Sequence, residues 1–179
     1  MYLLNRQQIL AAIERKDLDI WYLIDERLEH SYYYFTLSPE IEMHDRDGVW
    51  KPEILASGVP LTLTPGQCVR VKSFESFSLS ARIFALLGST TDLVLRGLVL
   101  QHGLTMDPLY PRAGRDDVET YGPLRMTLVN NASCDEEVRW GDHGDKIGKI
   151  CFFDISDTYP VKPSEKAAEQ YQERSEPVG

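Results

Sequence analysis

Residues 31–37 read SYYYFTL, a run of aromatic and β-branched side chains. Such side chains pack well on a pleated surface, so the run is typical of a β-strand. From here to about residue 155, strand-like runs such as 69–77 and 147–153 alternate with turn signals such as Asp47-Gly48. Short strands at this spacing predict an all-β sandwich or barrel. We therefore expect a mainly β fold.

The N-terminus is predicted to add one helix, over about residues 5–16. Asn5 can cap it, and Gln8 stands three residues later, as in a capping box. The length of 179 residues predicts a single domain. We expect this domain to cover residues 1–162, followed by a polar tail at 163–179 that opens with a short helix.

Two internal segments interrupt the strand pattern. Residues 88–96 predict a short helix capped by Ser89 or Thr90. Residues 109–122 combine prolines with several charged side chains and predict an exposed excursion between strands.

Composition excludes several classes of protein. The chain has 19 basic and 28 acidic residues, a net charge of −9, which argues against a nucleic-acid partner. Its three cysteines lack CxxC spacing, so we expect reduced thiols in a cytoplasmic protein rather than a disulfide framework or a zinc site. No secretory signal is visible, and no apolar run is long enough to span a membrane.

Several familiar catalytic motifs are missing. The sequence has no HxE with PCxxC of the zinc deaminases, no phosphate-binding GxxxxGK[ST] loop, no GxGxxG and no GxSxG. The four histidines lie far apart in the sequence, which argues against a histidine metal site.

Seven weaker motifs are informative through the order in which they follow one another. They are LNRQQILAAIE at 4–14, SYYYFTL at 31–37, PGQ at 65–67, GSTT at 88–91, MDP at 106–108, GPLRMTLVNN at 122–131 and GDKIGKICFF at 144–153. In this order the chain resembles the dCTP deaminase branch of the dUTPase superfamily, from about residue 3 to about residue 172. The resemblance implies a distorted β-barrel or jelly-roll core and a homotrimer with active sites between neighbouring subunits. It also implies a deoxynucleoside triphosphate ligand that carries Mg²⁺, and no zinc.

The resemblance assigns nucleotide-binding roles to three residues. Ser89 matches a serine whose hydroxyl and backbone hold phosphate or the reacting water, although Gly88 stands where the family has arginine. Arg96 matches, after a local shift, an arginine that lines the site. Asp107 matches an aspartate that binds the 3′-hydroxyl and, in the dUTPase branch, orients the attacking water. From the residues alone, Ser89 is equally a helix cap and Asp107 a turn residue.

The proton-transfer position departs from the family. Thr127 stands where the deaminase branch has a glutamate that shuttles the proton, and threonine cannot do acid–base chemistry near neutral pH. Glu119, on the 109–122 excursion, is an alternative source of a carboxylate. A further departure is Tyr34, where the family often has aspartate.

The resemblance also implies a C-terminal lid over the nucleotide. Tyr171 and Gln172 fit the start of its pattern, whereas the following residues depart from it. From the residues alone, Tyr171 is equally a side chain that packs the tail.

Three functions remain open from the sequence. The first is hydrolytic deamination of dCTP, or a related deoxycytidine nucleotide, to the uracil form, as part of pyrimidine deoxynucleotide metabolism. The second is a dUTP pyrophosphatase-like hydrolase in which Asp107 positions water and Mg²⁺ binds the phosphates. The third is a trimeric nucleotide-binding or assembly protein that has lost the chemistry, because a fold does not by itself establish an activity.

Overall fold

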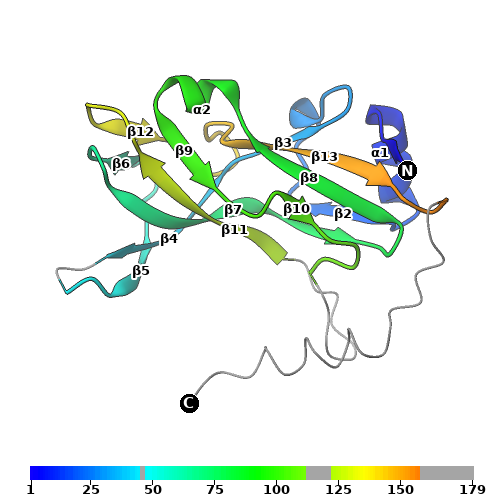
Figure 1. Cartoon of the computed structure of the whole chain (residues 1–179), viewed down its shortest axis with the longest axis horizontal. Helices are drawn as coiled ribbons and strands as arrows, with labels where there is room; N and C mark the ends of the chain where they lie inside the picture. The colour runs from blue at the N-terminus through cyan, green and yellow to red at the C-terminus, as the bar shows by residue number, and fades with distance from the viewer. Residues whose placement is uncertain (45–46, 112–121, 158–179) are drawn as a thin grey trace, which may run out of the picture.

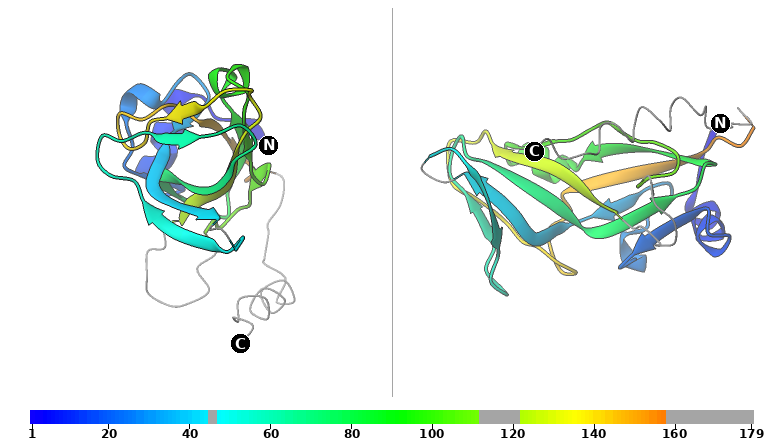
Figure 2. Two further views of the ribbon diagram at one scale, coloured as in Figure 1. Left: turned by 90° about the vertical axis from the view of Figure 1, so that its left-hand side faces the viewer. Right: turned by 90° about the horizontal axis from the view of Figure 1, so that it is seen from below.

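The computed structural model describes residues 1–44, 47–111 and 122–157. Within these residues the chain forms two main antiparallel sheets that curve around a common interior (Figures 1 and 2). The prediction of a mainly β fold is confirmed. No helix among the described residues is long and apolar enough to cross a membrane.

The first sheet is built around one central strand, β13 (Gly148–Asp154). One edge of β13 pairs with β8 (Ile83–Ser89), which in turn pairs with β10 (Thr105–Met106). The other edge pairs with β1 (Tyr2–Leu3) and β3 (Tyr33–Phe35).

The second sheet has six strands and is built around β7 (Cys68–Leu79), the longest strand of the fold. Its strands, besides β7, are β11 (Gly122–Asn130) and β9 (Leu98–Gln101) on one side and β4 (Leu37–His44), β5 (Trp50–Ile54) and β2 (Leu18–Trp21) on the other. Residues of β7 are alternately buried and more exposed, so every second side chain faces outward.

Short elements close the ends of the sheets. Strands β6 (Leu61–Leu63) and β12 (Glu136–Val138) pair with each other, and a 3₁₀ turn, η1, covers Asp25–Arg27.

The two helices begin at clear capping residues. Helix α1 (Arg6–Glu14) has the predicted capping box, with Asn5 and Gln8 bonding each other's backbone N–H groups. Helix α2 (Thr91–Leu95) is capped by Thr90, so of the two predicted caps Ser89 is not the one used.

The chain passes from the first sheet to the second at Thr36, where a buried ion pair meets it. The guanidinium of Arg27 lies 2.5 Å from the carboxylate of Glu75 and donates to the Thr36 hydroxyl at 3.0 Å. The Thr36 backbone N–H donates to the same carboxylate at 3.0 Å, and the Thr36 hydroxyl donates to the carbonyl of Gly141. Burial raises the pKa of Glu75, an effect that these hydrogen bonds and the Arg27 charge partly offset.

Some predictions lie outside the described residues. Of the 109–122 excursion only residues 109–111 and 122 are described. The tail at 163–179 and the domain boundary predicted before it lie wholly outside.

Candidate functional site

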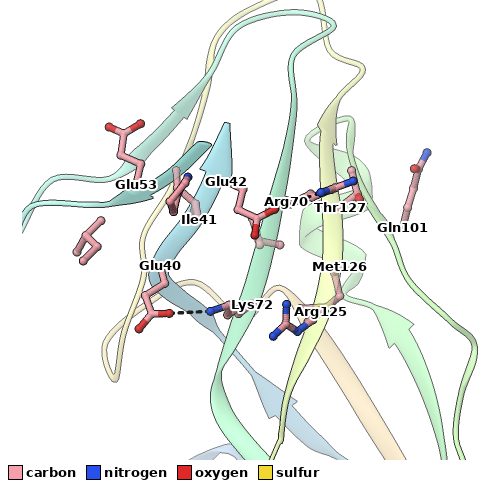
Figure 3. Close-up of a pocket in the computed structure, with 13 residues that line it drawn as sticks. Glu40, Ile41, Glu42, Glu53, Arg70, Lys72, Gln101, Arg125, Met126 and Thr127 are labelled. Carbon is pink, nitrogen blue, oxygen red and sulfur yellow. Dashed lines mark hydrogen bonds and ion pairs between the residues drawn. The ribbon is translucent and has the colours of Figure 1, made fainter. Parts of the chain in front are cut away.

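A hollow of about 480 Å³ lies over the outward face of the six-stranded sheet (Figure 3). Strands β4, β5, β7, β9 and β11 all contribute side chains to it. Thr127, where the resemblance expects the deaminase glutamate, lines this hollow and is half-buried. The alternation of β11 turns Arg125 and Thr127 outward, while Leu124, Met126 and Leu128 are buried in the core.

Strand register arranges the hollow in two parallel rows. The Thr127 row runs across four strands: Glu42 pairs with Arg70, Arg70 with Thr127, and Thr127 with Gln101. In the flanking row, Arg125 pairs with Lys72, which contacts Glu40. Side chains that share a row on one face are direct neighbours.

Ion pairs fix the charged side chains of both rows. Arg70 Nη1 lies 3.3 Å from Glu42 Oε2, and the guanidinium also lies 4.3 Å from the centre of the Trp50 ring. Lys72 Nζ lies 2.7 Å from Glu40 Oε2, and this contact holds the pKa of Glu40 below its usual range. Figure 3 shows Arg70 reaching from β7 toward Thr127. The hollow therefore presents a carboxylate, a guanidinium, a hydroxyl and an amide along one line.

A second cluster, the lysine–tyrosine patch, surrounds the Gly88–Ser89 step. It consists of Tyr32, Tyr34, Lys146 and Lys149. Lys149 stands directly opposite Gly88 across β13 and β8, and its Cε would lie 3.6 Å from a Cβ at Gly88. Lys149 also pairs with Tyr34 of β3, so its side chain stands between the two.

The lysines of the patch are held by aromatic rings. Lys146 Nζ lies 4.4 Å from the centre of the Tyr34 ring and Lys149 Nζ lies 5.7 Å from that of Tyr32. The Tyr34 hydroxyl donates to that of Tyr32 at 3.4 Å, and this bond together with burial raises the pKa of Tyr34 to about 12. The patch is thus a positive surface in a chain of net charge −9.

Arg96 belongs to neither cluster and lies at the C-terminal end of α2. Its guanidinium contacts Glu136 at 2.9 Å, Asp145 at 3.5 Å and Asp92 at 3.8 Å, and it donates to the carbonyl of Glu137. These partners raise the pKa of Arg96. A nucleotide that used this arginine would have to compete with three carboxylates.

Ser89 and Asp107 stand at opposite ends of the same strand pair. Asp107 is exposed and follows Met106, which pairs with Ala85 of β8, whereas Ser89 ends β8 and pairs with Gly148. Measured along β8, the position beside Asp107 lies five residues from Ser89, which is about 16 Å at about 3.3 Å per residue. One protomer therefore does not bring Ser89 and Asp107 together.

Other predicted site residues are not described. Tyr171, Gln172 and Glu119 lie outside the described residues. Conversely, Glu42, Arg70, Gln101 and Lys149 emerge only from the structure, because strand register and not sequence spacing places them beside Thr127 and Gly88.

Metal ligands do not converge in the described part of the chain, where no three His, Cys, Asp or Glu side chains form a metal-binding group. The carboxylates of Glu40 and Glu42 are each occupied by a cationic side chain. These two carboxylates are therefore engaged by cations within the chain.

Comparison with known proteins identifies the fold. No protein-family model matches the chain, and no curated protein matches it in sequence. The structure superposes on 2′-deoxycytidine 5′-triphosphate deaminase from Agrobacterium tumefaciens with a TM-score of 0.63 at 14% identity. The match covers 84% of this chain and 48% of the deaminase, so the chain spans about half of that protein's length.

Two dUTPases are also similar, at a greater distance. One is from phage phi11 of S. aureus, with a TM-score of 0.45, 15% identity and coverage of 83% of this chain and 96% of the dUTPase. The other is the native dUTPase of EIAV, with a TM-score of 0.41, 10% identity and coverage of 75% and 96%. Only the first superposition, on the deaminase, is close enough to define a shared fold. The described residues therefore adopt a fold similar to that of this dCTP deaminase.

Proposed function

We propose that this chain is a dCTP deaminase-like hydrolase, which converts dCTP or a related deoxycytidine nucleotide to its uracil form in pyrimidine deoxynucleotide metabolism in the cytoplasm. The observation that carries the proposal is the hollow in front of Thr127. It combines a hydroxyl, an amide and a held carboxylate at the position where the resemblance places the deaminase glutamate. Gln101 offers a donor and an acceptor side by side, which suits the polar edge of a pyrimidine.

The triphosphate in this proposal binds at the lysine–tyrosine patch. Lys149 supplies beside Gly88 the positive charge that the resemblance expects from an arginine, and Ser89 adds a hydroxyl. Mg²⁺ enters with the phosphates and offsets their charge. Asp107 accepts a hydrogen bond from the 3′-hydroxyl, and Tyr171 and Gln172 belong to the lid.

A complete site in this proposal needs two protomers. The separation of about 16 Å along the strands between Ser89 and Asp107 supports it, because one protomer holds these two residues apart. We propose a homotrimer in which Asp107 and Thr127 of one protomer face the lysine–tyrosine patch of its neighbour.

A second candidate is nucleotide binding without turnover. Thr127 favours it, because a threonine hydroxyl cannot act as a general acid or base near neutral pH. The dUTP pyrophosphatase-like alternative needs only Asp107 and Mg²⁺, and it predicts different products.

The test is incubation of the full-length chain and Mg²⁺ with dCTP, dUTP, their mono- and diphosphates and the ribonucleotides, followed by chromatography. Conversion of dCTP to dUTP supports the deaminase, and release of monophosphate and pyrophosphate supports the hydrolase. A folded trimer that binds dCTP without turnover supports the second candidate.

The phosphate subsite has its own matched pair of variants. Lys149→Gln removes a charge-assisted contact worth about 1.5–3 kcal/mol and should weaken dCTP binding about tenfold or more. Lys16→Gln removes an equal charge from the exposed end of α1 and should leave binding unchanged. Equal affinities in the two variants would contradict phosphate binding at the patch.

A further inference from the structure

We propose that Glu42 is the catalytic carboxylate of this site and does the proton transfer that Thr127 cannot do. The inference rests on the proposed deaminase function and adds to it a residue from β4. None of the sequence motifs that carry the resemblance contains an acidic residue of this strand. All the residues that this proposal involves line the hollow.

Strand register brings Glu42 into the Thr127 row. Arg70 pairs with Glu42 on one side and with Thr127 on the other, and Arg70 Nη1 holds Glu42 Oε2 at 3.3 Å (Figure 3). Two strand spacings of about 4.8 Å separate β4 from β11. A pyrimidine that lies over β7, between these two strands, is within reach of both the Glu42 carboxylate and the Thr127 hydroxyl.

The other two carboxylates of the hollow, those of Glu40 and Glu53, are less well placed for this proton transfer. Glu40 belongs to the flanking row, where Lys72 holds it at 2.7 Å. Glu53 pairs with Ile41, a buried residue, so it starts from the opposite face of the sheet to Glu42. Glu42 is thus the carboxylate that shares both the row and the face of Thr127.

The chemistry needs one carboxylate and no further reactant besides water. Glu42 accepts a proton from water as the water oxygen bonds to C4 of the cytosine ring and the electron pair of the C4=N3 bond moves to N3. That proton then passes to the amino group, the bond from C4 to the amino nitrogen breaks and ammonia leaves as the C4=N3 bond re-forms. The remaining hydroxyl proton moves from the oxygen to N3, so that C4 carries a carbonyl, N3 carries the proton of uracil and Glu42 is again ionised. Arg70 positions the carboxylate, and the Thr127 hydroxyl hydrogen-bonds the water.

The experiment compares Glu42→Gln with Glu14→Gln in the full-length chain with dCTP and Mg²⁺. A general acid–base group contributes about 10²–10⁴-fold, so Glu42→Gln should lower kcat by that factor. Its Kd for dCTP should stay within about threefold, because glutamine keeps the shape of the side chain. Glu14→Gln removes an exposed carboxylate from α1, outside the hollow, and should keep the wild-type kcat.

A second substitution makes the assignment sharper. Adding Thr127→Glu to the Glu42→Gln variant returns a carboxylate to the hollow from β11 and should recover at least about tenfold of the lost kcat. The assignment is overturned if Glu42→Gln has the same kcat as the wild type. It is also overturned if Glu119→Gln loses turnover and Glu42→Gln does not. A wild-type trimer without any deamination refutes the proposed function, and the role of Glu42 with it.

Discussion

Replacing Arg27 by methionine should strongly destabilise the fold. The substitution keeps an apolar stem of similar length but leaves the Glu75 carboxylate, which is fully buried, without its counter-charge. The carboxylate would retain the Thr36 N–H at 3.0 Å, the Tyr33 hydroxyl at 3.3 Å and its own backbone N–H. Removing one partner of a buried ion pair costs about 3–5 kcal/mol, which is a large part of the ~5–15 kcal/mol that holds a domain folded.

The loss should depend on pH in a defined direction. Burial already raises the pKa of Glu75 in the folded chain, and removal of Arg27 raises it further. The folded state then binds a proton more tightly than the unfolded state, so stability falls as pH rises above the ordinary glutamate pKa of about 4.3. The difference in the free energy of unfolding between variant and wild type should therefore be smaller at pH 5 than at pH 7.

Urea unfolding measures both effects. With a slope of about 2 kcal/mol per M, a loss of 3–5 kcal/mol shifts the midpoint down by about 1.5–2.5 M. Both proteins are compared at one concentration, because assembly into oligomers makes the measured free energy of unfolding depend on protein concentration. The double variant Arg27→Met/Glu75→Leu should recover most of the loss, since it leaves no buried charge. A shift below about 0.5 M, or a loss that is the same at both pH values, would refute the reasoning.

Three further predictions test other parts of the fold. Gly148→Ala should cost about 1–3 kcal/mol or more in urea unfolding, because its Cβ would lie 2.1 Å from the buried Phe35 ring; Gly103→Ala, whose Cβ meets nothing closer than 3.9 Å, is the control and should cost less. Asn5→Ala removes the α1 cap and should cost about 1 kcal/mol, whereas a cost near zero would mean that the capping box adds no stability. Tyr34→Phe should remove from the phenolate absorbance titration a component with a midpoint near pH 12, and a midpoint near 10 would contradict the hydrogen-bonded environment.

Local sequence signals predict the elements of this fold well. The capping box of Asn5 and Gln8 predicts α1, and the aromatic run at 31–37 predicts a strand. The pattern of this run does not show that the chain passes from one sheet to the other within it, where β3 ends at Phe35 and β4 begins at Leu37. That change depends on Glu75, which meets the chain at Thr36 from a distant strand, and no local pattern encodes such a contact.

The site is less predictable than the fold. Thr127 is found from its place in a motif, but its neighbours Arg70 and Glu42 are fixed by the register of three strands. A shift of register by one residue would turn each of these side chains to the other face, so their meeting cannot be derived from a single sequence. Arg96 illustrates the opposite case, because a motif suggests the site whereas the folded chain surrounds the side chain with carboxylates.

The contact between Lys149 and Gly88 has a consequence for how distant relatives are compared. Along the chain, position 88 has no side chain, so a residue-by-residue comparison with a protein that has arginine there would record only the loss of a charge. In space, the Lys149 side chain from the next strand covers the same spot, with its Cε 3.6 Å from where a Cβ would stand. Two chains of one fold can thus place a charge at the same location from different strands. Searches that score neighbouring strands jointly would find such exchanges, which position-by-position motifs discard.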